Sequence, residues 1–197
     1  MEFNRSKFGV VQKIIPIGDT GQFDEMFVQP IDFIQVKNVQ YILYTGYNLS
    51  YVARGGIAFS TSHGETWIKH PANPIIPLGG TGAFDDTQVV PVAFIYMGTE
   101  FEMPWIVPRY RKPTSDVMGK WYLFYKAMHG QNKSFAVAYG EHFEELTKKK
   151  LFDIASDDNW GDFRVDFNED LGAFKLIFSD MNTGSGTMDA NCILLKI

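Results

Sequence analysis

The sequence has almost no cysteine: Cys192 is the only one among 197 residues. One thiol permits no disulfide within the chain. Histidine is also scarce, and no group of cysteines and histidines has the spacing of a zinc site. The sequence contains neither a glycine-rich phosphate-binding loop nor the turn that carries a nucleophilic serine. We therefore expect no cofactor and no metal in this protein.

An excess of positive charge and long apolar runs are missing as well. The formal net charge is −5, and the basic residues are scattered apart from the lysines at 148–150. Because a nucleic-acid-binding surface needs a basic patch, we expect no nucleic-acid partner. No apolar run is long enough for a membrane span, and residues 1–5 lack the apolar core of a secretion signal. We expect no membrane partner, and a location in the cytoplasm or in a particle assembled inside the cell.

The chain does contain one long stretch that occurs twice. Residues 14–30 read IIPIGDTGQFDEMFVQP and residues 75–91 read IIPLGGTGAFDDTQVVP, at a constant offset of sixty-one residues without a gap. A period of this length is typical of repeat architectures, in which each unit is a supersecondary element packed against its neighbours. With 45% hydrophobic residues, the chain can bury a substantial core.

Segments with the composition of β-strands follow each copy of the repeat. In the first unit they are 27–36, 39–45, 56–60 and 67–76, the last broken by two prolines as an edge strand tolerates. In the second unit they are 87–97, 120–126, 135–139 and 143–154, and in the shorter third unit 163–167, 173–179 and 192–197. Four antiparallel strands per unit describe a propeller blade. The sequence thus predicts an all-β fold, a single domain over 1–197 with three β-propeller blades at about 16–76, 77–154 and 155–197.

The third unit has no fourth strand, and the N-terminal segment offers one. The repeat offset places 6–15 opposite 67–76, the outer strand of the first unit. Propellers often close by lending a terminal strand to the blade at the opposite end, so we expect a swapped or closing strand here. A simple extended arm is the alternative. Because three twisted blades cannot surround an axis, we also expect a homo-oligomer or a propeller completed by another chain.

Residues 60–67, with the sequence STSHGETW, resemble the Asp-box turn of sialidase-type propellers. Ser62 stands where that pattern has aspartate. In such turns small polar side chains bond to the backbone, the glycine has a positive φ, and the tryptophan packs between blades. The resemblance implies a structural role, so we expect no catalytic role for His63.

The repeated stretch and the strands after it resemble the five-bladed propeller glycosidases, the group of arabinanases, xylosidases and fructosidases with its related mannoside phosphorylases. The matching segments are 73–77, 84–86 and 122–125, and in the first unit 41–44, 56–60 and 64–67. The resemblance covers roughly residues 10–145 and implies a glycosidase-like propeller in a shortened, three-blade form. In those enzymes carboxylates around the central axis cleave the glycosidic bond.

Two of the family's carboxylates normally precede the prolines of the inner strands. Here those positions are Gln29 and Val90, which can neither carry a proton nor attack an anomeric carbon. This departure favours a non-catalytic carbohydrate-recognition or assembly module with a glycosidase-like fold. An active glycoside hydrolase is one alternative, and a structural subunit of a larger particle, such as a viral tail or capsid component, is the other.

The acidic residues of the repeat are the first candidates for a glycan site, because they lie at the starts of the inner strands. They are Asp24, Glu25, Asp85 and Asp86. The alternative is a local role in which each caps the backbone of its own turn. The loops between second and third strands share that end of a propeller and add Tyr51, Arg54, His129 and Asn132. Such aromatic and planar polar groups suit carbohydrate, and they suit a protein partner equally.

An insertion at 99–119 separates the first two strands of the second unit and contains three prolines. Its aromatic and basic residues make it more than a connecting turn. Loops at this position leave a propeller on the face away from the candidate site. We therefore predict an interface with another chain, anchored by Trp105, Arg109 and Tyr110.

Overall fold

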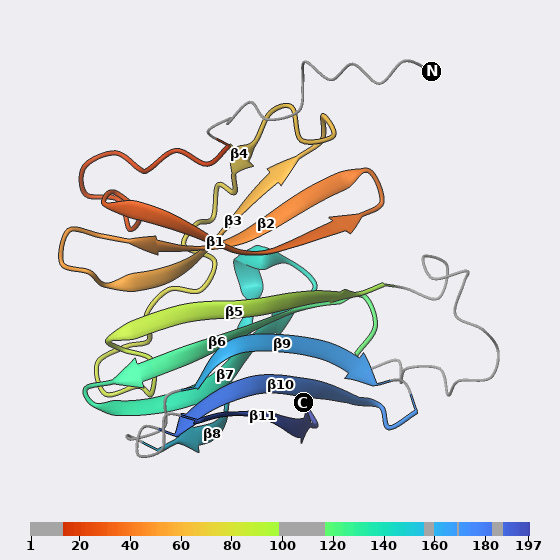
Figure 1. Cartoon of the computed structure of the whole chain (residues 1–197). Coiled ribbons are helices and arrows are strands. Elements are labelled where there is room, and N and C mark those ends of the chain that lie inside the picture. The colour runs from red at the N-terminus through yellow and green to blue at the C-terminus, as the bar shows by residue number, and fades with distance from the viewer. Residues whose placement is uncertain (1–13, 99–116, 156–159, 169, 183–186) are drawn as a thin grey trace.

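The computed structural model describes residues 14–98, 117–155, 160–168, 170–182 and 187–197 (Figure 1). Within these residues the fold is all-β, with three antiparallel sheets and a single 3₁₀ turn, η2 (Phe143–Glu145). The sheets have four, four and three strands. We call them sheets A, B and C in chain order. The prediction of an all-β fold built from meandering antiparallel sheets is confirmed.

Each sheet is built from successive strands of the chain. Sheet A consists of β1 (Phe27–Val36), β2 (Val39–Tyr47), β3 (Ala53–Ser60) and β4 (Ile68–Lys69). Sheet B consists of β5 (Gln88–Met97), β6 (Lys120–His129), β7 (Asn132–Gly140) and β8 (Thr147–Ile154). Sheet C consists of β9 (Trp160–Asn168), β10 (Ala173–Asn182) and β11 (Thr187–Leu195).

The repeat is visible in the backbone of the first strands. The pairing of β1 with β2 shifts register between Pro30 and Asp32, and that of β5 with β6 shifts between Pro91 and Ala93. Proline has no N–H to donate to the ladder, and a bulge accommodates such a residue. The two strands are therefore interrupted at positions sixty-one residues apart.

The predicted outer strand at 67–76 is much shorter in the structure. Only Ile68 and Lys69 pair with β3, and the chain rejoins this strand as a single bridge between Ile76 and Gly55. Pro71 and Pro74 lie in the gap, where neither can donate a backbone hydrogen bond. The prolines thus end the strand earlier than its apolar residues alone would indicate.

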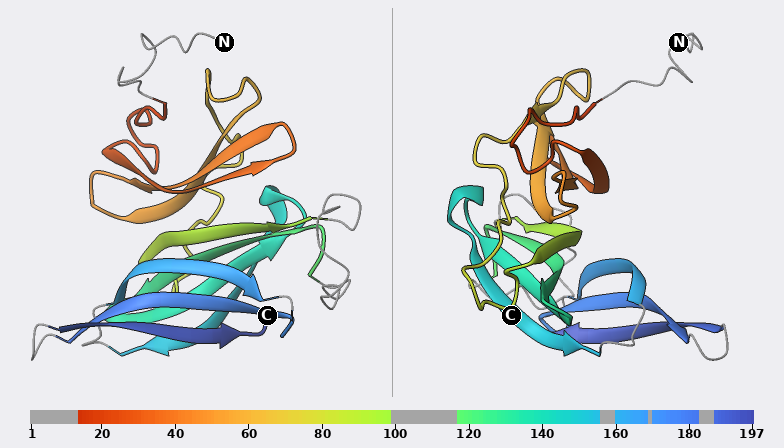
Figure 2. Two further views of the ribbon diagram at one scale, coloured as in Figure 1. Left: turned by 45° about the vertical axis from the view of Figure 1, so that its right-hand side comes forward. Right: turned by 90° about the vertical axis from the view of Figure 1, so that its left-hand side faces the viewer.

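The sheets are stacked, with sheet B between the other two (Figures 1 and 2). The core shared by sheets A and B includes Leu43, Ile57, Phe94 and Leu123. The core shared by sheets B and C includes Phe124, Phe135, Phe174 and Leu176. Each fully buried side chain of this size contributes about 2 kcal/mol. Strand β5 contacts both β1 and β9, so the first strands of the three sheets are neighbours, like the inner strands of a propeller.

The turn at 60–67 has the hydrogen bonds of an Asp-box. Ser60 Oγ accepts from the backbone N–H of Ser62 at 3.2 Å and of Gly64 at 2.9 Å. The hydroxyl of Ser62 accepts from the N–H of Thr66 at 2.9 Å, in the place of the usual aspartate. Trp67 packs against the side of sheet A and donates through Nε1 to the Gly64 carbonyl at 3.1 Å. The turn is therefore held by its own side chains, which accounts for the sequence pattern.

Some predicted features lie outside the described residues. Segment 6–15 is described only at its last two positions, and the insertion at 99–119 only from Val117 onward. The closing strand and the interface of Trp105, Arg109 and Tyr110 therefore stay predictions. Within the described ranges, no helix has the length and apolar character needed to cross a membrane.

Candidate functional site

Asp24 and Asp85, which share a repeat position, form equivalent buried ion pairs. Each side chain is 1% exposed. Lys69 Nζ lies 2.6 Å from Asp24 Oδ2, and Lys148 Nζ lies 2.6 Å from Asp85 Oδ2. The lysines belong to β4 and β8, the last strands of sheets A and B. Each ion pair thus ties the turn before a sheet to the far edge of that sheet.

A buried tyrosine completes each cluster. The hydroxyl of Tyr44 donates to Asp24 Oδ2 at 3.1 Å, and that of Tyr125 donates to Asp85 Oδ2 at 3.3 Å. Burial raises the pKa of both phenols, and the adjacent carboxylate raises it further. Both tyrosines are therefore protonated at neutral pH and act as donors to the carboxylate.

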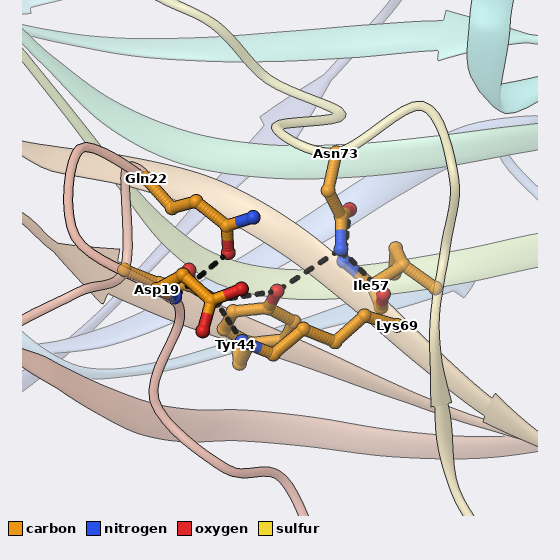
Figure 3. Close-up of polar contacts among 7 residues, drawn as sticks. Asp19, Gln22, Tyr44, Ile57, Lys69 and Asn73 are labelled. Atoms are coloured by element: carbon orange, nitrogen blue, oxygen red, sulfur yellow. Dashed lines mark hydrogen bonds and ion pairs between the residues drawn. The ribbon is translucent and has the colours of Figure 1, made fainter.

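Asn73 extends the cluster in sheet A. Its Nδ2 donates to the Tyr44 hydroxyl at 3.0 Å and to the Ile57 carbonyl at 2.9 Å, and its Oδ1 accepts from the Ile57 N–H at 2.9 Å. Figure 3 shows this amide between the Tyr44 ring and the backbone of β3. The side chain of Asn73 therefore fastens the segment after β4 to β3, where the prolines interrupt the backbone ladder.

A glycine makes room for each buried carboxylate. A Cβ atom added at Gly18 would overlap Oδ1 of Asp24, and one added at Gly79 would overlap Oδ1 of Asp85. The same turns are closed by backbone hydrogen bonds, from Gly18 N–H to the Asp24 carbonyl at 2.9 Å and from Gly79 N–H to the Asp85 carbonyl at 3.1 Å. The repeated glycine and aspartate of the sequence are thus parts of one structural unit.

Glu25 and Asp86 have the local capping role that was the alternative for this turn. Gly21 N–H donates to Glu25 Oε2 at 2.6 Å, and Gly82 N–H donates to Asp86 Oδ2 at 2.8 Å. Glu25 also contacts the loop after the second strand of its sheet, and Asp86 contacts the last residue of that strand in sheet B. A backbone N–H of the β2–β3 loop donates to Glu25 Oε1 at 3.3 Å, and His129 Nδ1 lies 2.8 Å from Asp86 Oδ1. Turns and loops therefore meet at one end of each sheet, as the sequence predicted.

A cleft of about 540 Å³ opens beside this end of sheet B. It lies between the turn before β5, the hairpin that joins β6 to β7, and strand β8. Its side chains are those of Phe84, His129, Gln131, Asn132, Lys133, Ser134, Lys150, Asp153 and Ile154. The structure thus brings two predicted residues, His129 and Asn132, into one cleft with Ser134 and Asp153, which the sequence did not single out.

The two carboxylates beside this cleft are held in their ionised form. Asp153 accepts from Lys150 Nζ at 3.0 and 3.1 Å and from Ser134 Oγ at 2.8 Å. The hydrogen bond from Lys150, followed by that from Ser134, lowers the pKa of Asp153. The hydrogen bond with His129 likewise lowers the pKa of Asp86, helped by the N–H of its own turn.

Sheet A has a cleft of about 490 Å³ at the equivalent place. Phe23 lines this cleft in the position that Phe84 has in the cleft of sheet B. Arg54, at the start of β3, also lines it. Tyr51 lies in the β2–β3 loop, where the residue is 60% exposed and its carbonyl accepts from Gln88 Nε2 at 3.5 Å. The loop candidates are therefore divided between the two sheets.

Sequence reasoning missed the lysines and tyrosines of the buried clusters. The tyrosines carry a signal, since Tyr44 and Tyr125 end the matching segments YILY and YLFY. The lysines carry none, because they lie 45 and 63 residues after their aspartates and so do not follow the constant offset of the repeat. Only the folded sheets bring these groups together.

Comparison with known proteins identifies the fold. No protein-family model matches the chain, and no curated protein sequence matches it. The structure of Zg3597, a family 117 glycoside hydrolase from the marine bacterium Zobellia galactanivorans, matches with a TM-score of 0.60 at 14% identity, over 93% of this chain and 50% of that one. The structure of BT0996, determined as an RGII complex, matches with a TM-score of 0.56 at 13% identity, over 92% of this protein and 55% of that one.

A third similar structure is the GH32 beta-fructofuranosidase of Bombyx mori, determined as a mutant in complex with sucrose. It matches with a TM-score of 0.50 at 12% identity, over 82% of this chain and 32% of that one. This protein therefore spans about half the length of the first two structures that it matches. At such identities the likeness concerns the fold alone. The chain has a glycosidase-like propeller fold, as the sequence resemblance implied.

Proposed function

We propose that this protein is a carbohydrate-recognition module that binds a saccharide in the cleft of sheet B without cleaving it. The observation that carries this proposal is the chemistry of that cleft. Its side chains suit a sugar, while its carboxylates are held in the ionised form by their neighbours. A module of this kind would keep the fold of a glycosidase and have no hydrolytic step.

The cleft offers the groups that recognise sugar hydroxyls. The amides of Gln131 and Asn132 can each donate and accept, and the Ser134 hydroxyl can do both. Phe84 adds an apolar ring against which the C–H face of a sugar can pack. The volume of about 540 Å³ lies within the usual range for small-ligand sites.

Hydrolysis would need a protonated carboxylic acid with a raised pKa, placed opposite a second carboxylate. The pKa values of Asp86 and Asp153 are instead lowered by their partners. Asp24 and Asp85 are 1% exposed and are paired with lysines. None of these four acids is therefore suited to protonate a leaving sugar at neutral pH.

The structural matches give independent support for a saccharide ligand. Two of the matched proteins are glycoside hydrolases by family, and one of these was determined with sucrose bound. Because identity is only 12–14%, this support extends to the class of ligand and does not specify a sugar.

A glycan array followed by titration calorimetry tests the proposal. We expect at least one bound saccharide, whose affinity falls about tenfold in Asn132→Ala, the effect of losing one hydrogen bond. Asn38→Ala, in the exposed β1–β2 turn, is the matched control and should bind like the wild type. Release of a shorter sugar would instead identify a glycoside hydrolase. An array with no bound glycan would contradict the proposal and favour a structural subunit.

A further inference from the structure

Phe33 and Phe94 occupy the same place in consecutive sheets but differ sharply in exposure. They are sixty-one residues apart, and each lies in the first strand of its sheet, just beyond the proline bulge. Phe94 is 3% exposed, whereas Phe33 is 53% exposed. The phenylalanine at this position is thus buried in sheet B and exposed to solvent in sheet A.

The repeated stretch before each sheet shows the same contrast. Ile75 is 4% exposed, and its counterpart Ile14 is 36% exposed. Leu78 packs against the core between sheets A and B, and its counterpart Ile17 is 50% exposed. We call the surface formed by Ile14, Ile17 and Phe33 the outer face of sheet A. It carries apolar residues at the positions that are buried one repeat later.

Sheet A is the structure that covers these positions in sheet B. Strand β5 contacts β1, β2 and β3, and Phe94 lies in the same buried core as Leu43 and Ile57 of sheet A. Because the outer face of sheet A repeats the apolar side chains of that interface, it is suited to receive another sheet of this kind.

At the opposite end of the stack, sheet C has a surface that corresponds to the face of sheet A in contact with sheet B. Ile177 pairs with Cys192 in neighbouring strands, as Leu43 pairs with Ile57. Leu176 and Phe178, on either side of Ile177, belong to the core with sheet B, so Ile177 and Cys192 face away from sheet B. Cys192 is exposed on this far face of sheet C.

One further exposed apolar residue, Leu194, lies beside that pair. Leu194 lies two residues after Cys192 in β11, on the same side of the sheet, and is 51% exposed. Leu43 and Ile57 hold the corresponding places in sheet A. Both are 0% exposed because sheet B covers them. The far face of sheet C therefore has a small apolar centre. Arg164, which pairs with Ile177, and Lys175, which pairs with Leu194, lie on the same side and give this centre a charged rim.

We propose that the far face of sheet C in a second copy of this chain packs on the outer face of sheet A. A two-fold axis repeats the contact, so that both open faces of both copies are covered. The result is a closed ring of six sheets, which lies within the range of about four to eight blades found in propellers. A second copy is favoured over an unrelated partner because this chain itself carries both halves of the interface.

Sedimentation of the full chain is the first test. The wild type should have twice the mass of one chain, and Phe33→Lys should dimerise at least tenfold more weakly, since a charge would be buried in the contact. Leu49→Lys is the matched control, because Leu49 is 67% exposed in the β2–β3 loop and outside both faces. A wild type that stays monomeric at its highest soluble concentration would overturn the proposal.

Oxidative cross-linking is the second test, and it identifies the contacting surfaces. Cys192 is the only cysteine of the chain and occupies the place that Ile57 has in sheet A. In Phe33→Cys the new thiol should form a disulfide with Cys192 of the other copy and give a covalent dimer. The double variant Phe33→Cys, Cys192→Ser should lose that product. A disulfide formed within one chain, or no disulfide while the protein remains dimeric, would refute the proposed contact.

Discussion

The ammonium group of Lys148 lies 2.6 Å from the carboxylate of Asp85, whose side chain is 1% exposed. Replacing this lysine by a neutral residue of similar size leaves a buried charge without its partner. We expect Lys148→Met to lower the free energy of unfolding by about 3 kcal/mol. This value is at the lower end of the usual cost of breaking a buried ion pair, because Lys148 itself reaches solvent. Urea unfolding measures this change.

Lys149 provides the control for that measurement. It is the next residue in β8, is exposed, and points to the other side of the strand. We expect Lys149→Met to change the free energy of unfolding by less than about 0.5 kcal/mol. Equal losses in the two variants would show that the strand, and not the ion pair with Asp85, is responsible.

Gly79 and Gly80 give a second matched pair. A Cβ atom at Gly79 would overlap the Asp85 carboxylate, whereas one at Gly80 meets nothing within 4 Å. We expect Gly79→Ala to destabilise the protein by about 2 kcal/mol through overpacking, and Gly80→Ala to have little effect. Thermal unfolding of both variants tests this, and a Gly79→Ala protein as stable as the wild type would show that the turn relaxes without strain.

Tyr125 should make stability fall at alkaline pH. Burial and the Asp85 carboxylate raise its pKa in the folded state above the usual value of 10.0. Its contribution to stability is therefore fully present below pH 10 and is lost as the pH rises above 10, where the phenol ionises only in the unfolded chain. We expect Tyr125→Phe to lose about 1 kcal/mol at pH 7 and to show a shallower decline above pH 10 than the wild type.

Tyr51→Phe is the control for the alkaline measurement, because this residue is 60% exposed. Unfolding free energies measured between pH 7 and about pH 11 distinguish the variants. If Tyr125→Phe and the wild type decline in parallel, the buried phenol does not contribute to the pH dependence.

Lys150 should keep Asp153 ionised at the cleft. The hydrogen bond from Lys150 is the main cause of the lowered pKa of Asp153, so Lys150→Met should raise that pKa toward the usual 3.8. A carboxyl with a lowered pKa adds stability above its unfolded value, and this stability is lost as the pH falls through the folded pKa. We therefore expect the wild type to lose stability more steeply than Lys150→Met as the pH falls below 3.8.

An NMR titration of the Asp153 carboxyl measures its pKa directly in both proteins. A wild-type pKa above the usual value would contradict the ion pair. It would also restore Asp153 as a possible acid in the cleft, and the case against hydrolysis would then fail for this residue.

The strands were largely predictable from sequence because their composition and the repeat carry the same information. The first strand has the predicted bounds, Phe27–Val36, and the resemblance to propeller glycosidases implied the fold that the structural matches show. The outer strand was predicted too long, since composition gives no measure of how far Pro71 and Pro74 interrupt backbone pairing.

The site was less predictable, for a physical reason. Asp24 and Asp85 were identified as equivalent from the repeat, but their partners Lys69 and Lys148 come from the far edge of each sheet. Contacts across a sheet depend on twist and register, which a linear spacing does not contain. In the cleft, Asp153 and its partners likewise come together only when β8 pairs with β7.

One NMR experiment tests the central claim, that the cleft of sheet B binds a saccharide and does not cleave it. Labelled protein is titrated with a glycan selected on the array, and the spectrum of the glycan is recorded again after a day in the same tube. The account predicts shift changes concentrated at 129–134 and 150–153, with the glycan signals unchanged. Shift changes confined to other residues, or new signals from a released sugar, would contradict it.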